Sequence, residues 1–100
     1  MVLEYVVYRL PRELRSAYEE ASLKASGALS AAPECKNFEL AHCVEEPELY
    51  IWRITWESID AHLKGFRQSG HFEEYFGALK DYFPYVDQMH HYQAVDLAKG

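Results

Sequence analysis

Four segments of the chain carry the alternating or densely apolar pattern that is typical of β-strands. They span residues 2–9, 36–44, 49–56 and 85–95. The first and third, VLEYVVYR and LYIWRITW, are rich in the β-branched and aromatic residues that favour a pleated sheet. The second and third segments are separated by EEPE, and Pro47 within it cannot donate to a strand ladder. We therefore expect these two segments to form a hairpin.

Two further segments place apolar residues at spacings of three and four, which predicts amphipathic helices. The first begins after Pro11, a residue suited to a first helical turn, and its apolar face is Leu14, Tyr18, Ala21, Ala25 and Ala28. The second follows a predicted cap at Ser69 and ends at Pro84, with an apolar face of Phe72, Tyr75, Phe76, Leu79 and Phe83. A short helix over residues 58–64 is expected between the hairpin and this helix, because Ser58 can cap it and Gly65 follows.

The predicted order is strand, helix, strand, strand, helix, strand. This is the βαββαβ order of an α+β, ferredoxin-like domain. Such a domain has a four-stranded antiparallel sheet in the spatial order 4-1-3-2, with both helices on one face. We expect one domain over residues 1–100, with its core at about 2–95.

Both faces of the predicted sheet are apolar. On the first strand, Val2, Val6 and Tyr8 take one parity while Leu3, Tyr5 and Val7 take the other. Helices can cover only one of these faces. Since 49% of the chain is hydrophobic, we predict that the second face meets another copy of the chain in a two-fold homodimer.

Charge and cysteine content restrict the partners and the compartment. The formal net charge is −6, and Lys and Arg form no run, so a nucleic acid is not expected as a partner. Glu4 and Arg9 interrupt the apolar start, so neither a signal peptide nor a membrane span is expected. If Cys35 and Cys43 lie on one extended strand, they are about 26 Å apart and cannot form a disulfide. We expect a cytoplasmic protein with reduced thiols.

The histidines are the candidate catalytic residues. His62 lies four residues after the predicted cap, and an imidazole can act as a base near neutral pH; the alternative is an exposed surface histidine. His71 in a first helical turn is expected to be solvated. His90 and His91 are adjacent on a strand, so at most one can face a pocket, and the sequence leaves open which. His42 lies on the far edge strand, about 14 Å from the last strand, which makes a three-histidine metal site within one chain a poor fit. A site shared across the dimer is the alternative that remains open.

Arg53 lies in mid-strand with parity opposite to Trp52 and Trp56. A buried arginine needs a partner. The strand parities place Glu39 on the wrong face, so we expect the partner to come from another strand or another chain, or to be an anionic ligand.

One set of residues resembles a known family. The set comprises W-E-S at 56–58, A-H at 61–62, G-F-R at 65–67, Ser69, Phe72, Y-F at 75–76 and M-x-H-Y at 89–92. It resembles the antibiotic biosynthesis monooxygenase domain, and the resemblance spans about residues 2–95. That family has a ferredoxin-like fold and pairs into a dimeric α+β barrel.

The resemblance implies a function as well. Some of these relatives oxygenate quinols or polyphenols without a metal or an organic cofactor, so a cofactor-independent monooxygenase for a small aromatic substrate is implied. Trp56 and His62 match a tryptophan that ends the third strand and a polar ring six residues later. Trp56 would then pack the substrate, and His62 would transfer a proton.

The remaining site residues follow from the same resemblance. Phe66 and Phe76 would line the pocket, and Tyr92 with His90 or His91 would orient the substrate. Phe66 and Phe76 also stand where the haem-degrading relatives have a tryptophan and a histidine, which disfavours haem degradation.

A non-catalytic alternative remains open, in which the same dimeric fold binds a hydrophobic ligand or regulates a partner. An open cleft lined by His62 would favour catalysis. A pocket filled by Phe66, Phe72 and Phe76 would favour the alternative.

Overall fold

The computed structural model describes residues 1–98. Its elements are β1 (Val2–Arg9), η1 (Arg12–Leu14), α1 (Arg15–Ala31), β2 (Cys35–His42), β3 (Leu49–Trp56), η2 (Ala61–Gly65), η3 (Phe66–Gln68), α2 (Gly70–Leu79), η4 (Lys80–Tyr85) and β4 (Val86–Gln93). All strand pairs are antiparallel, in the order β2-β3-β1-β4. This confirms the ferredoxin-like α+β fold and the predicted strand order.

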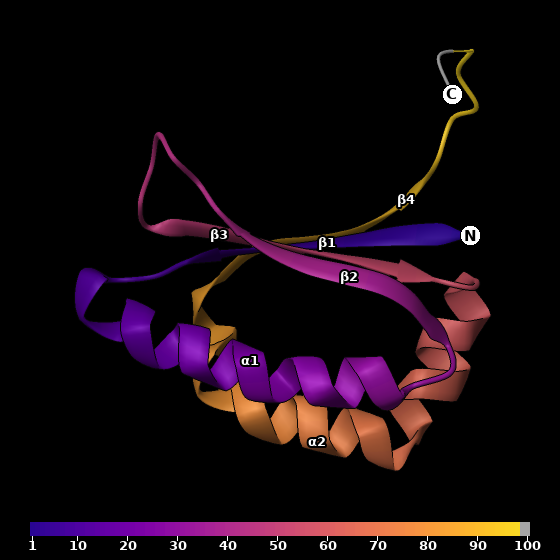
Figure 1. Cartoon of the computed structure of the whole chain (residues 1–100), viewed down its shortest axis with the longest axis horizontal. Helices are drawn as coiled ribbons and strands as arrows, with labels where there is room; N and C mark the ends of the chain where they lie inside the picture. Colours follow the sequence, from indigo (N-terminus) through magenta and orange to yellow (C-terminus); the bar gives the residue numbers. More distant parts are fainter. Residues whose placement is uncertain (99–100) are drawn as a thin grey trace.

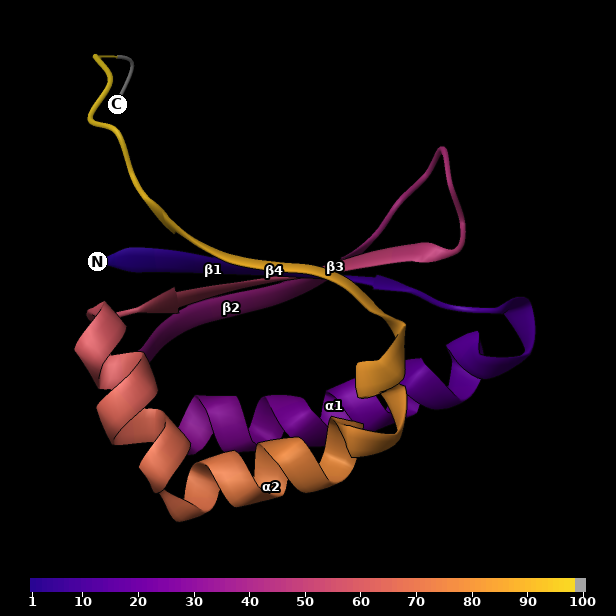
Figure 2. The ribbon, with the colours of Figure 1, turned by 180° about the vertical axis from the view of Figure 1, so that it is seen from behind.

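The molecule has two layers, the sheet and the pair of helices. Figures 1 and 2 show α1 and α2 on the same side of the sheet, packed against each other. No helix within residues 1–98 covers the other side, which we call the bare side of the sheet. After β4, residues 94–98 extend away from both layers (Figure 1). None of the helices within residues 1–98 combines the length and apolar character that a membrane span requires.

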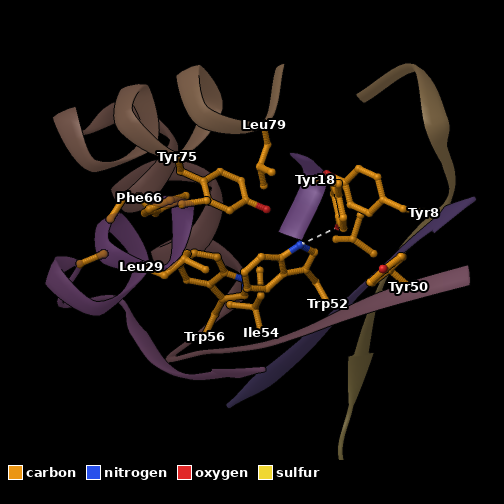
Figure 3. Packing of buried hydrophobic residues seen from close by; sticks show 14 of the residues in the cluster. Tyr8, Tyr18, Leu29, Tyr50, Trp52, Ile54, Trp56, Phe66, Tyr75 and Leu79 are labelled. Carbon is orange, nitrogen blue, oxygen red and sulfur yellow. Dashed lines mark hydrogen bonds between the residues drawn. The ribbon is translucent and has the colours of Figure 1, made fainter. Parts of the chain in front are cut away.

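The core lies between the sheet and the helices. Alternate residues of β1 and β3 point into it: Val2, Glu4, Val6 and Tyr8 from β1, and Tyr50, Trp52, Ile54 and Trp56 from β3. Aromatic rings fill much of this space, as Figure 3 shows. The indole Nε1 of Trp52 donates to the hydroxyl of Tyr18 on α1 at 3.0 Å, which satisfies a buried donor and ties the helix to the sheet.

The connection between β3 and α2 differs from the predicted short helix. Ser58 does cap the segment, because its Oγ accepts from the backbone N–H of Ala61 at 2.9 Å. The segment then forms one π-helical turn, η2, and a 3-10 turn, η3, rather than an α-helix over 58–64. Ser69 precedes α2, but its hydroxyl donates backward to the carbonyl of Phe66 at 2.7 Å and does not cap the helix.

Two other predictions need correction. The second helix ends at Leu79 rather than near Phe83, and the chain continues as the 3-10 segment η4, which contains Pro84. The prediction that Glu39 lies on the wrong face for Arg53 is wrong. The β2–β3 register places these two residues directly opposite each other, and Arg53 Nε donates to Glu39 Oε1 at 3.1 Å.

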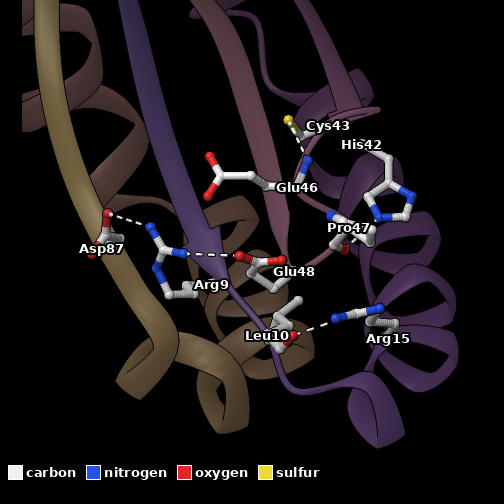
Figure 4. Close-up of polar contacts among 9 residues, drawn as sticks. All are labelled: Arg9, Leu10, Arg15, His42, Cys43, Glu46, Pro47, Glu48 and Asp87. Atoms are coloured by element: carbon white, nitrogen blue, oxygen red, sulfur yellow. Dashed lines mark hydrogen bonds and ion pairs between the residues drawn. The ribbon is translucent and has the colours of Figure 1, made fainter.

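The sheet end nearest the β2–β3 hairpin is held by polar contacts (Figure 4). Arg9 of β1 contacts Glu48 at 3.2 Å and Asp87 of β4 at 3.9 Å. His42 Nε2 lies 2.6 Å from the carbonyl oxygen of Pro47 within the hairpin. Arg9 thus links the hairpin to β4, and His42 belongs to the hairpin.

Candidate functional site

A pocket of about 280 Å³ lies between the helix-facing side of the sheet and the segment from η2 to α2. Its wall is largely aromatic, with Trp56, Phe66, Phe72, Tyr75, Phe76 and Phe83 among the lining residues. Polar side chains line it as well, namely Glu4, His62 and Arg67. The pocket therefore combines flat apolar surfaces with ionisable groups.

His62 is positioned by the end of β3 and the turn that follows. Trp56 is the last residue of β3, and the turn capped by Ser58 folds back so that the His62 ring stacks on the Trp56 indole. The ring centroids are 4.3 Å apart and the planes differ by 6°. His62 is only 3% exposed, so the predicted alternative of a surface histidine does not describe it.

Glu4 is the site residue that sequence reasoning missed. It is 4% exposed, and its Oε1 accepts from the indole Nε1 of Trp56 at 3.0 Å. The same oxygen lies 3.6 Å from His62 Nε2. Glu4 shares its parity with Val2 and Val6, and this placement of a carboxylate on the apolar face of a strand was the signal available in the sequence.

His91 reaches the site from β4. Its Nε2 lies 2.8 Å from Nδ1 of His62, and the β1–β4 register places it opposite Glu4. His90 and Tyr92 have the other parity and lie on the bare side of the sheet. There the Tyr92 ring packs edge-on against the Tyr5 ring, with ring centroids 5.2 Å apart. Of the last-strand residues expected to orient a substrate, the structure therefore brings only His91 to His62.

Burial controls the charge of the two buried ionisable groups. It lowers the pKa of His62 to about 3, and the positive charges of Arg67 and His91 act in the same direction. Burial also raises the pKa of Glu4, opposed by the hydrogen bond from Trp56 and by the charges of His91 and Arg67. His62 is therefore neutral near pH 7, and its contact with Glu4 is neither an ion pair nor, at 3.6 Å, a hydrogen bond.

The three side chains form a chain of contacts. One ring nitrogen of His62 faces Glu4 and the other contacts His91, which is only partly buried. A neutral imidazole can accept a proton at one nitrogen and release one from the other. One ligand atom from each of Glu4, His62 and His91 lies within 4.8 Å of the others, so these residues could also hold a metal ion.

The other predicted residues divide between the pocket and the surface. Phe66 is buried in the pocket wall against Trp56, with ring centroids 4.7 Å apart. Phe76 also lines the pocket, although 42% of it is exposed. His71 lies in the first turn of α2, outside this pocket, and His42 lies in the distant hairpin.

Solved structures with this fold include proteins related to oxygenases. A candidate antibiotic biosynthesis monooxygenase from Bordetella bronchiseptica is 26% identical, with a TM-score of 0.81 over 94% of this chain and 96% of that one. A mutant of SnoaB, a cofactor-independent oxygenase from Streptomyces nogalater, has a TM-score of 0.78 over 99% of this chain and 97% of its own. At 11% identity, that likeness concerns the fold alone.

Sequence comparison gives the family. The uncharacterised protein YczJ of Bacillus subtilis (strain 168) is 26% identical over 95 residues, which cover 95% of this chain and all of that protein. Residues 1–78 match the family described as antibiotic biosynthesis monooxygenase, whose members include monooxygenases. The chain therefore belongs to the antibiotic biosynthesis monooxygenase family.

Proposed function

We propose that this protein is a monooxygenase that acts on a small phenolic or quinol-like aromatic compound bound in the pocket between sheet and helices. The observation that carries the proposal is the aromatic pocket in which Glu4, His62 and His91 form a chain of contacts. Its volume of about 280 Å³ is just below the range of about 300–1,000 Å³ usual for drug-sized ligands. A compact one- or two-ring compound suits this space.

The first chemical step is loss of the phenolic proton. Glu4 is the proton acceptor, because the burial that raises its pKa makes its carboxylate a stronger base than an exposed one. His62 is neutral and weakly basic, so it would pass a proton between Glu4 and His91 rather than store it. This transfer requires its Nε2 to move from 3.6 Å to hydrogen-bonding distance of Glu4 Oε1. This refines the role in proton transfer that the sequence suggested for His62. The partly buried His91 exchanges the proton with solvent.

The second step is reaction of the electron-rich phenolate with O₂. One oxygen atom enters the ring as a quinone oxygen, and the other leaves as water. The phenol supplies all the electrons, so this reaction needs no organic cofactor, in keeping with the description of SnoaB as cofactor-independent. The faces of Trp56 and Phe66 would hold the ring during both steps.

The functional unit in this proposal is a homodimer formed through the bare side of the sheet. Tyr5, Val7 and Ile51 lie on that side and are only partly buried in the single chain. A second copy would remove this apolar surface from water, which is the main driving force for association.

A non-catalytic ligand-binding role is the second candidate. It is favoured by the continuous aromatic contact along the wall, where the Phe66–Phe72 and Phe72–Phe76 ring centroids are each 5.7 Å apart. In that case 1-naphthol would bind in the pocket without oxygen consumption.

Quinone release from 1-naphthol with and without oxygen, together with oxygen uptake in air, tests the proposal. Wild type and His71→Ala should consume oxygen equally and release quinone, whereas Glu4→Gln and His62→Ala should be at least tenfold slower. Equal turnover by wild type and His62→Ala would contradict proton transfer through His62. Binding without uptake would support the ligand-binding role instead.

A further inference from the structure

We propose that Glu4, His62 and His91 form a binding site for one divalent first-row transition-metal ion, such as Zn²⁺ or Co²⁺. The site goes beyond the proposed function and does not depend on it. Two of the three side chains are almost fully buried, and the pocket opens beside them.

The donor set has the chemistry of a transition-metal site. Two imidazole nitrogens and one carboxylate oxygen bind Zn²⁺ and other first-row divalent ions, and three protein ligands leave positions for water or a ligand. Bonds of about 2.0–2.2 Å require ligand atoms to lie about 3–4 Å apart. The 3.6 Å between His62 Nε2 and Glu4 Oε1 already meets this requirement.

His91 is the ligand that must move. Its Nε2 contacts Nδ1 of His62 at 2.8 Å, whereas Glu4 faces the other ring nitrogen of His62, Nε2. One ligand atom from each of the three residues nevertheless lies within 4.8 Å of the other two. His91 is only partly buried and stands on β4, an edge strand paired to β1 alone. A rotation of this ring toward Glu4, with loss of its contact to Nδ1, would complete the three-ligand set.

The other two ligands are held in place by the surrounding structure. Trp56 stacks on the His62 ring and donates to Glu4 Oε1, so one side chain orients both ligands. The backbone N–H of His62 donates to the carbonyl of Ser58 at 3.2 Å, which fixes the turn that carries it. Contacts that orient the side chains bonded to a metal ion are a general feature of metal sites and strengthen binding.

Arg67 opposes cation binding. It lines the same pocket from η3, and its charge acts on both Glu4 and His62. Its guanidinium lies 6.0 Å from the Phe72 ring centroid. Removal of this charge without loss of a ligand should therefore tighten metal binding. If Glu4, His62 and His91 only stabilised the fold, this substitution would not change metal affinity.

Metal titrations of the chelator-treated full chain test the site. Zn²⁺ titration by calorimetry and Co²⁺ titration by visible absorption should each reveal one strong site per chain. Binding should weaken at least tenfold in His91→Ala and in Glu4→Gln, and should tighten several-fold in Arg67→Gln. Circular dichroism reports whether each variant is folded.

The controls are His42→Ala and His71→Ala, which remove histidines remote from the three ligands. Wild-type protein without a strong site would overturn the proposal, as would equal affinity in His91→Ala and the two controls. His91 is partly exposed, so this comparison remains decisive if Glu4→Gln fails to fold. Oxygen uptake by the metal-free protein is measured separately, so failure of the metal site and failure of the oxygenase proposal give different results.

Discussion

The rings of Trp56 and His62 lie parallel, 4.3 Å apart, and the indole N–H of Trp56 donates to Glu4 at 3.0 Å. The tryptophan thus makes two separate contacts with site residues, one through its ring face and one through Nε1. Its face positions the imidazole, and its Nε1 supports a buried carboxylate. Substitution by another aromatic residue can separate the two, because a phenyl ring retains a stacking face and lacks the donor.

Trp56→Phe should lower the free energy of unfolding by about 2–3 kcal/mol, because a buried carboxylate loses its hydrogen-bond donor along with some packing. Urea denaturation at pH 7 measures the loss. The double variant Trp56→Phe with Glu4→Leu should recover part of it, since no buried acceptor then remains unpaired.

Trp52→Phe is the matched comparison. Trp52 is equally buried and donates to the neutral hydroxyl of Tyr18 at 3.0 Å. Loss of a neutral hydrogen bond costs about 0.5–1.5 kcal/mol, so Trp52→Phe should lose less of its unfolding free energy than Trp56→Phe. Equal losses in the two variants would argue against a special role for the Glu4 carboxylate.

The pH dependence of stability should report the buried His62. Its folded-state pKa of about 3 is below its ordinary value of 6.5, so between these values the unfolded chain binds a proton that the folded chain does not. This group therefore lowers the unfolding free energy as pH falls below about 6.5, by at most about 1.4 kcal/mol per pH unit. The raised pKa of Glu4 acts in the opposite direction, because the folded chain then keeps a proton that the unfolded chain releases.

Comparison with His62→Phe isolates the histidine, because Glu4, Arg67 and His91 are present in both proteins. Urea denaturation with chelator at pH 7.5 and 5.5 should show a larger fall for wild type than for the variant. Identical falls would mean that His62 becomes protonated in the folded protein.

Periodicity was sufficient to predict the sheet and both helices, because strand and helix patterns each report which face is buried. It was insufficient for contacts between strands. His90 and His91 could not be distinguished without the β1–β4 register, which places His91 opposite Glu4. The Arg53–Glu39 pair depends in the same way on the β2–β3 register.

Glu4 illustrates a different limit. The sequence shows Glu4 among apolar residues of the same parity. That pattern alone does not distinguish a carboxylate with a function from one that only interrupts an apolar strand face. Only the three-dimensional contacts with Trp56 and His62 identify it as a site residue. The hydrogen bond of Ser69 could not be predicted from the sequence either. Its hydroxyl could accept from a backbone N–H of the first turn of α2 or donate to the preceding carbonyl of Phe66, and in the structure it donates to Phe66.

The bare side of the sheet leads to a prediction about assembly. Light scattering at micromolar concentration should give the mass of a dimer for wild type, because Tyr5, Val7 and Ile51 form an apolar surface that the helices do not cover. Ile51→Asp should give a folded monomer, since a charge at that position would be buried without a partner at the interface. Leu23→Asp is the control, because Leu23 is 76% exposed on α1, away from that side of the sheet, and should leave the dimer intact. A monomeric mass for wild type would refute the dimer, and a dimeric Ile51→Asp would place the interface elsewhere on the chain.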